Sequence, residues 1–170
     1  IFTPAYSHSD EFLLNPPIRI FNNTIGESGQ DVQPRIGIFV SSVYQPVIEN
    51  NEINFFRSNM SVYPSARGIW VQACVLPQIK ANSIIESQGN HNLFDNLIGI
   101  RSDANSNPCI GANDPLQNLG YGISFMGENG HVSMALNNFD ECDNGVQLDG
   151  AEIGTQGTQD RTDDNQWTDI

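Results

Sequence analysis

The feature that most limits the fold of this chain is a series of short runs in which apolar and polar residues alternate. Alternation with a period of two is typical of half-buried β-strands. Gly, Pro, Asn and Asp separate these runs, and all four residue types favour turns. No long window has apolar residues at the i, i+3, i+4, i+7 spacing of a helix. The sequence therefore predicts an all-β protein and argues against a parallel α/β sheet.

The candidate strands are short, and they lie at residues 18–21, 35–44, 53–57, 68–76, 79–86, 96–100, 121–127, 131–136 and 146–148. This pattern predicts an antiparallel β-sandwich or jelly roll with extended terminal arms. We expect an N-terminal arm at residues 1–15 and the sandwich domain at 16–148. Residues 149–170 are expected to form an acidic, polar C-terminal arm or incomplete further strands. No internal repeat is apparent.

The stretch GYGISFMGENGHVSMAL, residues 120–136, predicts the most specific local structure. Asn129-Gly130 favours a two-residue type I′ turn, so the flanking strands are expected to pair as an antiparallel hairpin. One face of that hairpin collects Ile123, Phe125, Val132, Met134 and Leu136, and the other collects Ser124, Met126, Ser133 and Ala135. The apolar face is expected to pack on a second sheet. That sheet would contribute Ile36, Ile38, Val40, Ile69, Val71 and Val75.

The chain is strongly acidic, with 20 Asp and Glu residues against 7 Lys and Arg and a formal net charge of −13. This charge argues against nucleic acid, which needs a basic surface, and against an anionic membrane surface. Cations and basic partners remain compatible with it. No apolar run is long enough to span a bilayer, and the start IFTPAYSHSD, without a Met, indicates a processed chain. We expect an extracellular protein or one on the surface of a cell or particle.

The chain contains three cysteines, Cys74, Cys109 and Cys142. Cys109 and Cys142 lie in polar, turn-rich surroundings, so a secreted chain either joins them in a disulfide or keeps three free thiols. Cys74 lies in the strand-like run WVQACVLP and is expected to be a small buried residue. Asn22 and Asn59 begin N-glycosylation sequons, which a chain rich in Asn, Ser and Thr also contains by chance.

No catalytic motif is recognisable in the sequence. None of His8, His91 and His131 lies in a nucleophile motif, and His131 is interpreted as a surface partner of Glu128 across the predicted hairpin. The acidic residues gather at turns and in the tail rather than inside strands, where glycoside hydrolysis on a β-sandwich needs them. No His/Cys cluster has zinc spacing. We therefore expect the chain not to be an enzyme.

The run DANSNPCIGAND is the best candidate for a small-ligand site. Asp103, Asn105, Asn107 and Asp114 occupy positions 1, 3, 5 and 12 of an EF-type calcium loop, in which alternate oxygens bind a hard cation. Two departures are Pro108, where the turn needs Gly, and Asp114, where the loop needs a bidentate Glu. The alternative is a turn without metal, because Asn and Asp form turns by themselves.

Exposed aromatic rings are the other candidate binding feature, because such rings stack on the faces of sugars. Tyr63 and Tyr121 flank predicted turns and are the preferred ligand-binding residues. Trp70 lies in the middle of a predicted strand and is assigned to the core.

The stretch MSVYPSARGIWVQACVLPQIKANSIIESQGN, followed by GYGISFMGENGHVSMAL and NQWTDI, resembles the laminin-G and concanavalin-A-like sandwich families. The resemblance covers a Trp-containing strand that ends in Pro, a Gly-Tyr-Gly strand and an Asn-Gly turn. It implies an antiparallel sandwich that binds glycans or matrix proteins, often with calcium at one rim, and it transfers no specific ligand residue. Two departures are the inserted loop at residues 102–119 and the end of the chain at residue 170, where such domains continue.

Two functions are compatible with these features. The first is a non-enzymatic structural subunit, of the filament, capsid or tail type, that self-assembles through sheet edges and terminal arms. The second is a secreted module that binds carbohydrate or protein in adhesion, with calcium as a cofactor. We expect copies of the chain itself as the main partner, and a glycan or an extracellular protein as the alternative.

Overall fold

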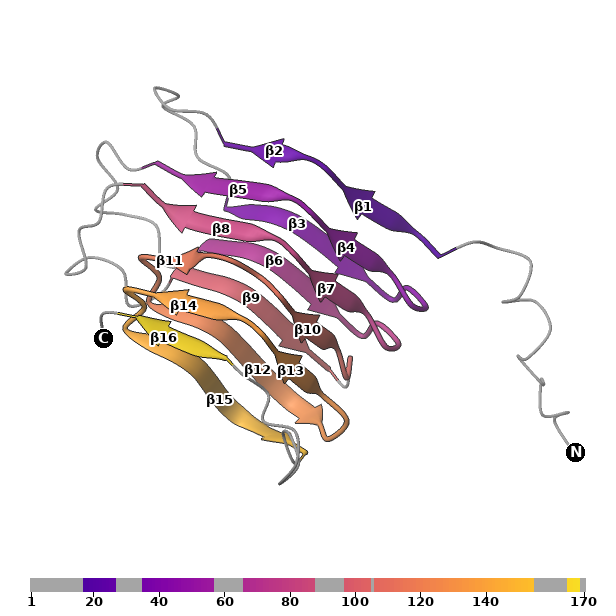
Figure 1. The fold of residues 1–170 in the computed structure, drawn as a ribbon. Helices are drawn as coiled ribbons and strands as arrows, with labels where there is room; N and C mark the ends of the chain where they lie inside the picture. The colour runs from indigo at the N-terminus through magenta and orange to yellow at the C-terminus, as the bar shows by residue number, and fades with distance from the viewer. Residues whose placement is uncertain are drawn as a thin grey trace, which may run out of the picture.

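The structure is a computed structural model, and it describes residues 17–26, 35–56, 66–87, 97–104, 106–154 and 165–168. The described residues form three sheets in which all paired strands are parallel. Each turn of the chain adds one strand to each sheet, so the molecule is a β-solenoid. Its turns stack from the indigo β1 to the yellow β16 in Figure 1. No helix long and apolar enough to cross a membrane occurs among the described residues.

Each sheet takes every third strand of the chain, apart from the last. Sheet A contains β1 (Arg19–Phe21), β4 (Val47–Glu49), β7 (Gln78–Lys80), β10 (Cys109–Gly111) and β13 (Ser133–Ala135). Sheet B contains β2 (Thr24–Ile25), β5 (Glu52–Phe55), β8 (Ser83–Glu86), β11 (Leu116–Gln117), β14 (Asn138–Asp140) and β16 (Gln166–Thr168). Sheet C contains β3 (Ile36–Ser41), β6 (Ala66–Gln72), β9 (Leu97–Asp103), β12 (Tyr121–Asn129) and β15 (Asn144–Ile153).

The predicted antiparallel β-sandwich or jelly roll is therefore wrong. The error begins at Asn129-Gly130, which forms a corner of the solenoid and not a hairpin turn. Strand β12 pairs with β9 and β15 in sheet C, whereas β13 pairs with β10 in sheet A. The Asn129 amide is buried and donates hydrogen bonds to the carbonyls of Met126 and Gly127, at 3.2 and 3.1 Å. It also accepts one from the Ser102 hydroxyl at 3.1 Å, so the side chain ties the corner to the preceding turn.

The predicted inward and outward faces hold better than the predicted fold, because a period of two buries the same side chains in a parallel or an antiparallel sheet. Ile123, Phe125, Val132 and Met134 are buried as expected. Two residues are exceptions. Leu136 is 60% exposed, and its φ of 58° belongs to a corner rather than a strand. Ser124, predicted on the outer face, is fully buried. Residues 149–153, predicted to belong to an arm or to further strands, complete β15.

The core is built from columns of apolar residues that occupy the same place in successive turns. In sheet A the column is Ile20, Ile48, Ile79, Ile110 and Met134. In sheet B it is Ile25, Ile53, Ile84, Leu116, Phe139 and Trp167. Most members are fully buried, so successive turns of the solenoid pack on one another through apolar side chains at equivalent positions.

A column of glycines in sheet C makes room for the side chains of sheet B. Its members are Gly37, Gly68, Gly99, Gly122 and Gly145. A Cβ at Gly99 would lie 2.6 Å from the carbonyl oxygen of Gly122 and 2.8 Å from Cδ1 of Leu119. No side chain fits there without moving the backbone, so this column sets how closely sheets B and C approach.

A column of asparagines joins the turns at the corner between sheets A and B. Its members are Asn23, Asn51, Asn82, Asn113, Asn137 and Asn165. The Asn82 Oδ1 accepts hydrogen bonds from the backbone N and the Nδ2 of Asn51, at 3.0 and 2.9 Å. The Asn82 Nδ2 donates to Asn113 Oδ1 at 3.0 Å and to the carbonyl of Ile48 at 3.0 Å. The four inner members, Asn51, Asn82, Asn113 and Asn137, thus satisfy one another's polar groups in the dry interior, whereas the end members Asn23 and Asn165 are exposed and half-buried, respectively.

These columns show that the chain contains an internal repeat, which the sequence prediction missed. The strings PVIENN, PQIKAN and PCIGAN begin at residues 46, 77 and 108. Their final asparagines are members of the ladder, and they are 31 residues apart. The next interval is 24 residues, because residues 118–120 replace the longer segment that joins sheets B and C in the preceding turn. The repeat is therefore regular in its strands and irregular in its length.

Replacing Asn82 with Ala should destabilise the protein by about 2–4 kcal/mol, because buried donors and acceptors in two neighbouring turns lose their partners. Urea unfolding followed by circular dichroism measures this. The control is Asn54→Ala, since the Asn54 amide donates to Glu52 at the surface, and its cost should stay within about 0.5 kcal/mol. Equal costs for the two variants would contradict a structural role for the ladder.

Candidate functional site

The outer face of sheet C carries the densest group of functional side chains among the described residues. Because the turns stack in register, Phe39, Trp70 and Arg101 occupy one column on neighbouring strands. Phe39 is 49% exposed, whereas its neighbours Ile38 and Val40 are buried. The alternation that builds the core therefore also directs these three side chains outward.

Phe39 and Trp70 form an aromatic pair on this face. Their ring centroids are 4.7 Å apart, and the rings are tilted by 47°. The indole Nε1 of Trp70 donates a hydrogen bond to Asp103 Oδ2 at 2.9 Å. Trp70 was predicted to belong to the core; it is instead half-buried on the outside, where this hydrogen bond fixes its orientation.

Asp103 organises the polar side of the pair. It is buried, and its carboxylate accepts hydrogen bonds from Arg101 Nε at 2.8 and 3.0 Å, as well as from Trp70. The Nη2 of Arg101 also lies 3.1 Å from the Met126 sulfur. The Arg101–Asp103 ion pair is therefore held on several sides and mostly excluded from water.

Arg67 also packs over the indole. Its Cζ lies 4.6 Å from the centroid of the Trp70 ring, which is a cation–π geometry. Burial lowers the pKa of Arg67, the positive charge of Arg101 lowers it further, and the charge of Asp103 opposes both effects. The guanidinium remains protonated in water at any ordinary pH, so Arg67 carries a positive charge in surroundings that disfavour that charge.

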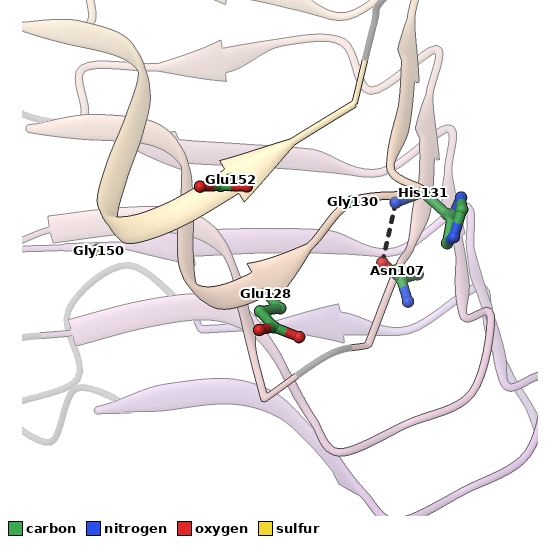
Figure 2. Close-up of a pocket in the computed structure, with 6 residues that line it drawn as sticks. All are labelled: Asn107, Glu128, Gly130, His131, Gly150 and Glu152. Atoms are coloured by element: carbon green, nitrogen blue, oxygen red, sulfur yellow. Dashed lines mark hydrogen bonds between the residues drawn. The ribbon is translucent and has the colours of Figure 1, made fainter.

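A polar pocket lies at the far ends of β12 and β15, with a volume of about 550 Å³. Figure 2 shows its lining residues: Asn107, Glu128, Gly130, His131, Gly150 and Glu152. Glu128 and Glu152 are register partners beyond an irregularity in the β12–β15 ladder, where Gly127 and Gly150 have positive φ values. The backbone N of His131 donates to Asn107 Oδ1 at 3.1 Å.

The chemistry available in this pocket is limited by its exposure to water. Glu128, His131 and Glu152 are all exposed, so no carboxyl group there has the dry surroundings that a general acid needs. No group of three or more His, Cys, Asp or Glu residues in the described part of the chain could hold a metal ion. The pocket is an acidic, solvent-exposed depression at the edge of the face.

The predicted calcium loop is divided between two corners of the solenoid. Asp103 ends β9, Asn107 lies at the corner between sheets C and A, and β10 separates both from Asp114. The oxygens of all three accept hydrogen bonds within the protein, that of Asp114 from Asn138 at 2.9 Å. Asn105 lies outside the described residues. The structure therefore does not bring the described candidate ligands together around one point.

The other predicted site residues lie in separate places. Tyr121 is half-buried on β12, in the outer column that also contains Ile98 and Asn144. Asn22 is exposed and directly follows β1. Tyr63 and Asn59 lie outside the described residues.

The expected Cys109–Cys142 disulfide is not formed, and all three cysteines are free. Cys109 is exposed on β10, whereas Cys142 is buried and its thiol donates to the carbonyl of Leu116 at 3.0 Å. Burial raises the pKa of Cys142 to about 11. Cys74 is buried, as predicted.

Sequence reasoning missed Phe39, Arg67 and Arg101 as site residues. The signal that finds them is the repeated Gly-Ile or Gly-Val pair, in the strings IGIF, RGIW, IGIR, YGIS and NGVQ. When these strings are aligned on the glycine, the residues at their fourth position form the outer column that contains Phe39 and Trp70. The residues at their first position form the column that contains Arg67.

Comparison of the chain with protein-family models, curated proteins and solved structures finds no match. The function must therefore be argued from the geometry of this chain alone.

Native protein at about pH 8 should expose one fast-reacting thiol per chain to a disulfide reagent such as DTNB, and three after denaturation. Cys109 is exposed, whereas Cys74 is buried and the raised pKa of Cys142 keeps its thiol protonated at this pH. The fast thiol should disappear in the Cys109→Ser variant. A Cys109–Cys142 disulfide would instead leave no fast thiol in the native protein and a single thiol after denaturation without reductant.

Proposed function

We propose that the outer face of sheet C binds saccharides and that the protein is a carbohydrate-binding module. The observation that carries this proposal is the ring pair of exposed Phe39 and half-buried Trp70 on neighbouring strands of sheet C. Aromatic rings offer an apolar surface to the C–H face of a pyranose, and a few fixed polar groups around them give specificity.

The rings are held in place before any ligand arrives. The hydrogen bond to Asp103 fixes the indole, and the Arg67 guanidinium packs over it. Strands on both sides of β6 fix the backbone beneath them. A site held in this way loses little side-chain entropy on binding, which favours affinity for a weakly apolar ligand.

Polar side chains for sugar hydroxyl groups lie in the next column of the same face. Ser41 and Gln72 are register partners there, next to Asp103. A hydroxyl and an amide each donate and accept hydrogen bonds, as sugar hydroxyl groups do. The face therefore combines a ring platform with neutral polar groups at its side.

Replacing Phe39 with Ala should weaken saccharide binding about fivefold or more, which corresponds to the loss of about 1 kcal/mol of ring contact. Isothermal titration against neutral and acidic oligosaccharides measures the effect. The matched control is Phe21→Ala: Phe21 is equally exposed, at 49%, but it lies on sheet A, beneath Arg19. Binding that is absent in the native chain, or equally sensitive to both changes, would contradict the proposal.

A second candidate function is end-to-end assembly, favoured by the edges of sheet C. In the described part of the chain, β3 and β15 are the edge strands. β15 has 10 residues, and Leu148 on it is 48% exposed, whereas β3 has the uncharged sequence IGIFVS. A long unpaired edge is a template for another strand, and pairing of two different edges continues as an open filament.

Assembly predicts that the native mass rises with concentration. Light scattering should give values above the 18.7 kDa of one chain at high concentration, and Leu148→Lys should shift the rise to higher concentration because it adds a charge at the edge. A constant mass of one chain at all concentrations would exclude this second candidate and leave saccharide binding unaffected.

A further inference from the structure

Arg67 differs from the other described arginines of the sheets in what surrounds its charge. Arg19 pairs with Glu49, and Arg101 pairs with Asp103. Arg67 has no carboxylate partner and no hydrogen-bond acceptor among the described residues, and its Nε is buried. A guanidinium has five N–H groups; the described residues offer no acceptor for them, and the Nε–H is also shielded from water.

Nothing nearby among the described residues can supply the missing acceptor. Asp103 is the closest acidic candidate on the face, but its two oxygens already accept from Arg101 and Trp70. The chain has 20 acidic residues against 7 basic ones, so an arginine without an acidic partner is unexpected here. An external anion would supply the missing acceptor. It would also offset the effects of burial and of the nearby Arg101 charge, both of which disfavour the isolated Arg67 cation.

The arrangement also limits what kind of anion fits. Both Arg67 and Phe39 contact the Trp70 ring: the Arg67 Cζ lies 4.6 Å from its centroid, and the centroid of the Phe39 ring lies 4.7 Å from it. A ligand that reaches the arginine therefore also meets the aromatic platform. A small inorganic ion would use the charge alone, whereas a sugar ring with an anionic substituent uses both.

We propose that this face selects acidic saccharides, with Arg67 binding a carboxylate or sulfate group of a sugar that packs on Phe39 and Trp70. This inference rests on the saccharide-binding function proposed above and adds its ligand class. A guanidinium is suited to the role because it can donate two parallel hydrogen bonds to a carboxylate or a sulfate. Arg101, already committed to Asp103, positions the indole and does not bind the anion.

The net charge of −13 opposes the approach of an anion, but the opposition is not uniform over the face. Glu128, Asp149 and Glu152 lie on β12 and β15, at the opposite side of the sheet from β3 and β6. Salt screens exposed charges over about 8 Å at physiological ionic strength, whereas a contact to Arg67 is screened much less. The acidic residues of β12 and β15 therefore lie apart from Arg67 on this face, with β9 between them and β6.

The test is a titration at about 0.15 M salt with three hexasaccharides: maltohexaose, sulfated maltohexaose and unsulfated chondroitin. We expect at least one of the two acidic ligands to bind at least tenfold more tightly than maltohexaose. Arg67→Gln should remove at least tenfold of that affinity and leave maltohexaose binding within about twofold, and Arg67→Lys should fall between, because it keeps the charge and loses the fork. Which acidic ligand responds distinguishes carboxylate from sulfate recognition.

The control is Arg19→Gln, which changes the net charge by the same amount on sheet A and should leave all affinities within about twofold. Circular dichroism shows whether each variant is folded, and the folded Arg67→Lys variant decides the question if Arg67→Gln does not fold. Maltohexaose binding as tightly as both acidic ligands, or insensitivity to Arg67, would overturn the inference while saccharide binding stands. Both proposals would be overturned if none of the three hexasaccharides binds and other neutral and acidic oligosaccharides also fail to bind.

Discussion

The buried asparagine ladder is the interaction on which the register of the solenoid depends. An amide in a dry interior must have both its donors and its acceptor satisfied, and a parallel stack meets this demand when every turn places an asparagine at the same point. Asn51, Asn82, Asn113 and Asn137 are almost completely buried, and each bonds to the asparagine of the next turn. A shift by one residue would put Ala112 or Asp114 opposite Asn82 in place of Asn113 and break its amide-to-amide hydrogen bond, so the ladder fixes the pairing of the turns.

Register then determines the two other features that matter for function. On the inside it aligns the glycine column with the apolar column of sheet B, so that each glycine receives a side chain such as Ile53 or Ile84. On the outside it aligns Phe39, Trp70 and Arg101 across three strands. The proposed binding face is therefore a direct product of in-register stacking and needs no special loop to form it. The length of the chain between sheets B and C can vary without disturbing that face.

The sequence predicts burial far better than it predicts topology. Alternation along residues 121–136 identifies Ile123, Phe125 and Met134 as core, because strand periodicity does not depend on the direction of the partner strand. Predicting the topology requires recognition of the repeat. The change of interval from 31 to 24 residues hides that repeat from a search for a constant period. Asn129-Gly130 then favoured the wrong answer, since a local turn preference is the same at a corner and in a hairpin.

The candidate site was predictable only in part, and for a related reason. The Asn and Asp residues of DANSNPCIGAND suggested calcium, but most described members hold backbone or side-chain groups at corners, and Asn113 belongs to the ladder. Trp70 was assigned to the core because a single strand does not reveal its outer face. Arg67 and Phe39 become visible as site residues only when the repeats are placed in register, which requires the fold.

Nuclear Overhauser contacts of Phe125 are the most direct test of the parallel, in-register stack. The solenoid predicts contacts from the Phe125 backbone to Ser102 on β9 and to Leu148 on β15, its register partners on the two sides. An antiparallel hairpin at Asn129-Gly130 would instead place Met134 opposite Phe125. Contacts to Ser102 and Leu148 would establish the stack, whereas cross-strand contacts between Phe125 and Met134, with none to β9 or β15, would contradict it and the binding face that depends on it.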